Sequence, residues 1–208
     1  MVLGVSVWVM VQHGLVFGGW FVFFITVEHL GERSLAITNI IRNISSFLFM
    51  FVQAFASVNS SLVGNLIGEG KSNEVMKICR KVILLCYAFV LPVVLFIVIC
   101  PNLVLRVFTD NIELITHSIP SLLVMLSSYL IAVPTFVWFC AVSGTGNTLS
   151  SLWIAIISLV VYIGYISIIS NYIPNLMLLW TSEHIYFLGL LILSLYFLLC
   201  HNWKRTKL

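Results

Sequence analysis

Six long runs of apolar residues constrain the fold of this 208-residue chain more than any other feature of its sequence. A helix crosses the hydrocarbon core of a bilayer with about 20 apolar residues, and the runs suit that length. Charged residues make up only 8% of the chain, against about 25% in a soluble domain, so they cannot cover a water-exposed surface. Strands of a membrane barrel would alternate in polarity within segments of about ten residues. The runs therefore predict an all-α integral membrane protein, whose helices satisfy their own backbone groups.

The expected transmembrane helices form a single domain over residues 1–208 and are separated by short polar or glycine-containing segments. The second helix is longer than a bilayer is thick, so we expect it to tilt or protrude. Pro120 is expected in the first turn of the fourth helix, where proline is tolerated. The six spans cover about residues 5–27, 35–66, 82–99, 120–142, 149–170 and 180–200.

Lysine and arginine residues predict the orientation of the chain, because short cytoplasmic loops are enriched in both. With six spans, the loop after the second span, the 144–148 turn and the C-terminal tail lie on one side of the membrane. That side holds seven basic residues against two on the other, so both termini are expected in the cytoplasm. The seven are Lys71, Lys77, Arg80, Lys81, Lys204, Arg205 and Lys207, and the two are Arg33 and Arg106.

Arg42 is a charged residue inside the second apolar run, where charges are rare. An arginine in the membrane costs several kcal/mol unless it is paired or hydrated, so its presence indicates a polar cavity. Asn39 lies three residues earlier on the same helix face, and Asn43 follows directly. Two interpretations stay open. Arg42 contacts a substrate, lipid or coupling ion, or it reaches the outer headgroups or pairs with Glu28 or Glu32.

Gln12 and Trp20 place a polar and an aromatic side chain within the first span. If both face a cavity, the ring of Trp20 suits an amphipathic organic cation through a cation–π contact. The alternative is that Gln12 bonds a neighbouring helix and Trp20 fills the core. The choice between these interpretations depends on which helices pack against the first span.

No pattern in the sequence indicates catalysis, a metal site or a nucleic-acid partner. The five cysteines have no Cys-x-x-Cys spacing, and the basic residues form short clusters without interleaved aromatics. The GEGKS segment Gly68–Ser72 lacks the earlier glycine of a phosphate-binding loop. All seven acids are expected near the ends of the spans, which leaves no carboxylate at mid-membrane for a coupling ion. The acids are Glu28, Glu32, Glu69, Glu74, Asp110, Glu113 and Glu183.

Four segments in order along the chain resemble the multidrug and toxic compound extrusion (MATE) transporters. They are GWFVFFITVEHLGERSLAITNIIRN at Gly19–Asn43, GNLIGEGKSNEV at Gly64–Val75, VSGTGNT at Val142–Thr148, and the WTSEHIY…WKRTK ending. Members of this family typically have twelve spans in two six-helix lobes with a cavity between them. The chain resembles the C-terminal lobe only, so the resemblance implies one MATE-type lobe.

The resemblance assigns structural roles to two groups of glycines. Gly64, Gly68 and Gly70 match the glycine loop between the second and third spans, and Gly144 and Gly146 match the family's second glycine turn. Their expected role is close helix approach or a sharp turn. Depth and helix face, rather than the resemblance, select the residues expected to line the cavity. These are Gln12, Trp20, Asn39, Arg42 and Asn43.

The resemblance implies secondary active efflux of drugs and organic cations across a bacterial inner (plasma) membrane, by antiport coupled to H⁺ or Na⁺. It implies no other cofactor and no enzymatic activity. The expected partners are membrane lipid, a small amphipathic substrate, and a second six-helix lobe or another copy of this chain. Two other functions stay open: a flippase for lipid-linked oligosaccharides, in which Arg42 contacts an anionic head group, and a non-transporting scaffold or truncated remnant.

Overall fold

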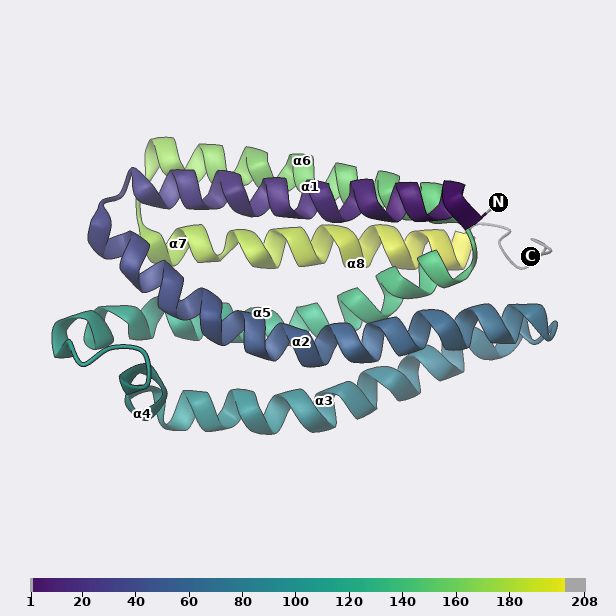
Figure 1. Cartoon of the computed structure of the whole chain (residues 1–208), viewed down its shortest axis with the longest axis horizontal. Coiled ribbons are helices and arrows are strands. Elements are labelled where there is room, and N and C mark those ends of the chain that lie inside the picture. Colours follow the sequence, from purple (N-terminus) through teal and green to yellow (C-terminus); the bar gives the residue numbers. More distant parts are fainter. Residues whose placement is uncertain (1, 201–208) are drawn as a thin grey trace.

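A computed structural model describes residues 2–200 of the chain, and these residues form a helix bundle in which successive long helices run in opposite directions (Figure 1). The side chains of residues 2–9 and of residue 13 are not described. The expected basic tail with Lys204, Arg205 and Lys207 lies outside the described residues. The elements are α1 (Val2–Glu28), α2 (Glu32–Gly68), η1 (Ser72–Glu74), α3 (Val75–Ile99), α4 (Pro101–Arg106), α5 (Ile112–Gly144), α6 (Thr148–Tyr172), α7 (Leu176–Trp180) and α8 (Ser182–Cys200).

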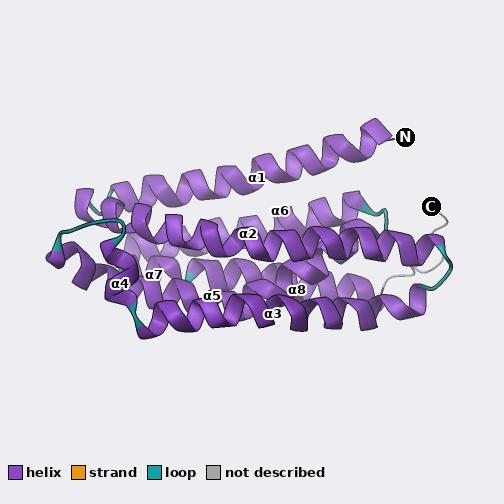
Figure 2. Cartoon of the chain, turned by 60° about the horizontal axis from the view of Figure 1, so that its bottom comes forward, coloured by secondary structure: helices purple, strands orange, loops and turns teal. Residues whose placement is uncertain are grey.

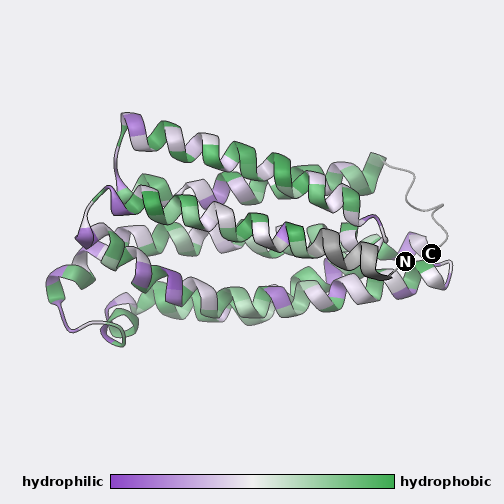
Figure 3. Cartoon of the chain, turned by 45° about the horizontal axis from the view of Figure 1, so that its top comes forward, coloured by the Kyte–Doolittle hydropathy of each residue, from purple (hydrophilic) through white to green (hydrophobic). Residues whose placement is uncertain are grey.

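Six segments of the described chain are long and apolar enough to cross a membrane, which confirms the predicted number of spans. They run side by side with loops at both ends (Figure 2), and most of their hydrophilic residues lie near the ends (Figure 3). The start of α1 and the end of α8 lie at the same end of the bundle as the loop between α2 and α3 (Figure 1). The six candidate segments are Met10–Glu28, Glu32–Gly68, Ser72–Ile99, Ile112–Gly144, Thr148–Tyr172 and Leu176–Cys200.

The fourth long helix begins earlier than the sequence predicts, and Pro120 lies inside it rather than in its first turn. The reason is a cap at Asn111, whose side-chain oxygen accepts hydrogen bonds from the backbone N–H groups of Glu113 (3.0 Å) and Leu114 (3.2 Å). Such a cap satisfies donors that have no partner within the helix. The expected start at Pro120 is therefore wrong, because the capping signal in the preceding loop was overlooked.

Helix α5 occupies the centre of the bundle. In an apolar stretch of 18 residues within α5, 67% of the residues are buried, against 39% or less in the corresponding stretches of the other five. Helix α5 packs against α2 and α8, and α6 in turn packs against α1 and α8. Buried Leu122, Met125 and Leu126 belong to the larger hydrophobic cluster, and Val137 and Ala141 to a second cluster nearer the end of α5. The lobe is thus organised around one helix that contacts little lipid.

Helices α2 and α5 cross closely at a pair of glycines. A Cβ atom added at Gly144 would lie 2.5 Å from the backbone oxygen of Ser60, and one added at Gly64 would lie 3.5 Å from the backbone oxygen of Gly144. The two turns at this end each contain a glycine with positive φ, Gly70 at 75° and Gly146 at 83°. Nothing lies within 4 Å of a Cβ at Gly68.

Replacement of Gly144 by alanine is expected to destabilise the lobe by about 1–3 kcal/mol, because the new methyl group has no room against the α2 backbone. The measurement is the thermal unfolding midpoint of the purified protein in detergent. Gly164→Ala is the matched control, since no atom lies within 4 Å of a Cβ at that helical position. An unchanged unfolding midpoint in Gly144→Ala would show that α2 and α5 can move apart at this position without loss of stability.

Candidate functional site

One face of α2 is polar and uncovered along much of its length. The residues that form it recur at intervals of three, four or seven positions, which places them on the same side of a helix. We call this surface the α2 polar face. It consists of Asn39, Asn43, Ser46, Gln53, Ser57, Ser61 and Asn65, of which Gln53 is half-buried and the others exposed, and the exposed side chain of Met50 interrupts it. Polar side chains that face lipid are unfavourable, so this surface requires a polar environment or a protein partner.

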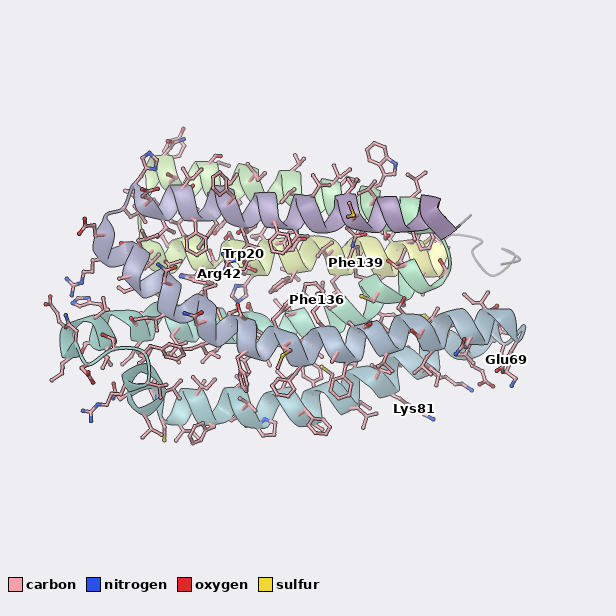
Figure 4. The ribbon with its side chains drawn as sticks, in the orientation of Figure 1. Trp20, Arg42, Glu69, Lys81, Phe136 and Phe139 are labelled. Carbon is pink, nitrogen blue, oxygen red and sulfur yellow. The ribbon has the colours of Figure 1, made fainter. Side chains whose placement is uncertain are left out.

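Arg42 lies at the edge of the α2 polar face and extends toward α1 (Figure 4). Its guanidinium carbon lies 4.5 Å from the ring centroid of Trp20 and 4.7 Å from that of Phe24. These distances are typical of cation–π contacts, which contribute about 0.5–2 kcal/mol. Arg42 forms no ion pair with Glu28 or Glu32, because the ion pairs among the described residues are Arg33–Glu113 and Lys71–Glu69.

Trp20 is held in place by other aromatic rings. It makes edge contacts with Phe23, at a centroid distance of 5.8 Å, and with Trp180, at 6.3 Å. Trp180 is fully buried at the junction of α7 and α8. The contact with Arg42 therefore rests on a packed aromatic cluster, and the ring predicted to bind an external cation already contacts a cation of the chain itself.

The other predicted cavity residues lie elsewhere. Gln12 is half-buried between α1 and α6, where its side-chain oxygen accepts a hydrogen bond from the hydroxyl of Ser151 (3.4 Å). This contact agrees with the alternative interpretation, in which Gln12 bonds a neighbouring helix. Asn39 and Asn43 are exposed on the α2 polar face. The structure thus brings Trp20 and Arg42 together and places Gln12 against a different helix.

Glu183 is a potentially functional residue that the sequence reasoning missed. We expected it near the end of a span with the other acids, but it lies in the first turn of α8 and is only 6% exposed. The hydroxyl of Tyr162 donates a long hydrogen bond of 3.5 Å to its carboxylate. A helical repeat through Trp180, Glu183, Phe187 and Leu190, all buried, is the signal that would have placed Glu183 on the inner face.

Several helices contribute to the surroundings of Glu183. Tyr162 from α6 contacts the carboxylate and packs against Tyr186 of α8 at a ring-centroid distance of 5.5 Å. Trp180, three residues before Glu183, contacts Trp20, over which Arg42 lies. Among the described residues, no three His, Cys, Asp or Glu side chains are grouped closely enough to hold a metal ion. The arrangement suits the binding of charged amphipathic groups between aromatic rings, an arginine and a buried acid.

Comparisons with known proteins were made for both sequence and fold. A sequence model of the family described as MatE matches residues 9–173. No protein among the curated sequences matches this chain. One similar solved structure is a MATE protein in the bent conformation, with a TM-score of 0.84 and 14% identity over 97% of this chain and 46% of that one.

Two further solved structures are similar to the fold at 16% identity. The first is an outward-facing multidrug resistance MATE family transporter of the MOP superfamily, with a TM-score of 0.80 over 98% of this chain and 46% of that one. The second is a MOP superfamily transporter from Pyrococcus furiosus, whose binding pocket is described as having reverse polarity. It has a TM-score of 0.78 over 94% of this chain and 44% of that one. The chain therefore spans less than half the length of the solved structures that it matches.

Proposed function

This chain belongs to the MatE family of membrane transporters, which are not enzymes, and from that premise we propose that it forms one lobe of a two-lobe exporter of small amphipathic compounds. The second lobe is another six-helix unit or a second copy of the chain. Substrate binds between the lobes, and the lobes rock against each other to open the site to either side in turn.

The α2 polar face is the observation that carries this proposal. It lies uncovered beside Arg42 and Trp20, whereas the outer surfaces of other helices carry large exposed apolar residues such as Val160 on α6 and Leu84 on α3. In a lobe surrounded only by lipid, the α2 polar face would be energetically unfavourable. A lobe that shares a hydrated cavity with a partner needs such a face, and Arg42 then faces water and substrate instead of hydrocarbon.

The transported compounds that we propose are organic cations and drugs, exchanged for H⁺ or Na⁺. Aromatic rings such as Trp20 and Phe24 attract cations, and the buried Glu183 supplies a negative charge behind them. The distribution of lysine and arginine supports an orientation with both termini in the cytoplasm, in the inner membrane of a bacterium.

A flippase for lipid-linked oligosaccharides is the second candidate. Arg42 favours it, because no hydrogen bond from the guanidinium is described among residues 2–200. An arginine with free N–H groups binds phosphate well. One arginine beside an acid is a weak basis for an anionic head group, so we rank this function below cation export.

Gradient-driven export tests the proposal. Vesicles that contain many copies of the purified chain, together with any second lobe that copurifies, are loaded with the fluorescent cation ethidium. We expect a pH or sodium gradient to accelerate its movement by at least tenfold over protein-free vesicles. Movement of a fluorescent lipid-linked saccharide without ethidium movement would support the flippase. Movement of neither compound would indicate a non-transporting scaffold or remnant.

A further inference from the structure

Glu183 is an acid buried in the helix bundle without a direct ionic partner. It is 6% exposed, and its one described hydrogen bond is the 3.5 Å contact from Tyr162. The two ion pairs of the described chain lie elsewhere, at Arg33–Glu113 and Lys71–Glu69. A carboxylate removed from water and left without a close cation is strongly disfavoured, and such a group takes up a proton or recruits a positive charge.

Arg42 is linked to Glu183 through one aromatic cluster, because its guanidinium lies over Trp20 and Trp20 contacts Trp180, three residues before Glu183. Its guanidinium does not reach the carboxylate and instead lies over the rings of Trp20 and Phe24. Arginine has a long side chain with a permanent charge, and Arg42 is half-buried at the edge of an open face. The guanidinium of Arg42 is therefore attracted both by the aromatic rings and by the carboxylate of Glu183.

The titratable groups near Glu183 on α5, α6 and α8 are tyrosines and one histidine. Helix α5 contributes Tyr129, whose hydroxyl is already bonded to the backbone oxygen of Ser45 (2.6 Å). Helix α6 contributes Tyr162, and α8 itself contributes Tyr186 and the neighbouring His184, which contacts Ser127 (2.9 Å). The described side chains of α1 and α7 that pack here are uncharged aromatics: Trp20, Phe23, Phe24 and Trp180.

A second observation shows that the polar groups here are not all satisfied by protein. The indole nitrogen of Trp180 is fully buried and has no hydrogen-bond acceptor among the described residues. Buried N–H groups without partners are rare in folded proteins. This N–H can donate a hydrogen bond to a water molecule or to another acceptor that enters the site.

We propose that Arg42 is a tethered internal cation that competes with the transported cation for the rings of Trp20 and Phe24, and that proton binding to Glu183 decides this competition. When Glu183 is ionised, it draws the guanidinium off the rings and opens them to substrate. When a proton occupies the carboxylate, Arg42 returns to the rings and expels the substrate. The contact of Arg42 with both rings shows that its guanidinium reaches the surface on which the substrate cation would bind.

This mechanism rests on the proposed function and assigns the coupling of that same site. Proton binding and substrate binding oppose each other through one side chain, so each weakens the other by the same factor. That reciprocity is what antiport requires. It also explains why a site for cations contains an arginine, because Arg42 binds to the rings when the transported cation is absent from them.

Binding of ethidium to the purified full chain in lipid nanodiscs tests the proposal, with fluorescence anisotropy as the readout at mildly acidic and mildly alkaline pH. We expect wild-type affinity to be about tenfold weaker at acidic pH. Glu183→Gln imitates the protonated acid, so its binding is weak at both pH values. Arg42→Ala leaves the rings open, so its binding at acidic pH is about fivefold tighter than that of the wild type.

Glu113→Gln is the matched control, because it removes an acid that pairs with Arg33 on the exposed surface. It should keep the wild-type pH dependence. Should Glu183→Gln fail to fold, Tyr162→Phe replaces it and keeps the carboxyl group. Without the hydroxyl that stabilises the anion, the midpoint of the pH dependence is expected to move toward alkaline pH. Unchanged pH dependence in the site variants, or weaker ethidium binding by Arg42→Ala at both pH values, overturns the competition.

A second readout needs no ligand and separates this inference from the proposed function. Infrared difference spectra between the two pH values should contain a protonated carboxyl band that is absent in Glu183→Gln and retained in Glu113→Gln. If wild-type chain binds no ethidium but shows this band, cation export fails while the protonation of Glu183 stands. If the band is the same in Glu183→Gln, the inference fails whatever the chain transports.

Discussion

Arg42→Ala in the assembled transporter is expected to reduce gradient-driven ethidium efflux by about tenfold to a hundredfold. The variant still binds the cation, because Trp20 and Phe24 keep their packing. It lacks the internal cation that displaces the substrate when the proton arrives. Efflux is therefore lost through failure of release rather than failure of binding. The measurement is the initial rate of ethidium movement in vesicles under an imposed pH gradient.

Arg33→Ala is the control for this experiment. Arg33 also lies on α2, but its side chain is 47% exposed and pairs with Glu113 at 2.8 Å. Exposed pairs of this kind contribute at most about 1 kcal/mol, so efflux should be close to the parental rate. Parental efflux by Arg42→Ala would show that Arg42 has no part in transport.

A single copy of the chain in a vesicle is expected to transport nothing. The α2 polar face is uncovered among the described residues, so an isolated copy can bind substrate on one wall but has no second lobe that could carry it across the membrane. The test compares vesicles reconstituted at so low a density that most hold one copy with vesicles that hold many. If two copies form the transporter, efflux should rise more steeply than in proportion to the number of copies.

Photo-crosslinking identifies the assembled surface in the same samples. A photoreactive residue at Ser57, on the α2 polar face, should join the chain to a second copy or to another lobe. The same residue at Val160, an exposed apolar position on α6, should join it to lipid only. Robust efflux from singly occupied vesicles would contradict the requirement for a second lobe.

The six spans were predictable from hydropathy because each one is a nearly uninterrupted apolar segment. The start of α5 was not predictable from hydropathy. It depends on the Asn111 cap, and the helix continues from there through Pro120. Hydropathy reports which segments enter the membrane. It does not report where a helix begins within the interface.

The candidate site was only partly predictable. Arg42 and Trp20 stand out in the sequence as polar or aromatic residues within apolar runs, but their contact depends on how α1 packs against α2. Glu183 was overlooked because it is near a loop in sequence, whereas it continues the buried helical repeat of Trp180, Phe187 and Leu190. The orientation of both termini toward the cytoplasm stays a prediction.

The packing of α1 has a consequence for how the protein is made. Helix α1 packs mainly on α6, which is translated after α2, α3, α4 and α5. At ordinary rates of synthesis, α6 emerges on the order of ten seconds after α1. During that interval α1 has no permanent neighbour apart from its limited contact with α2. Among the described helices, α1 is therefore made first and docks late, and membrane chaperones have a long opportunity to hold it.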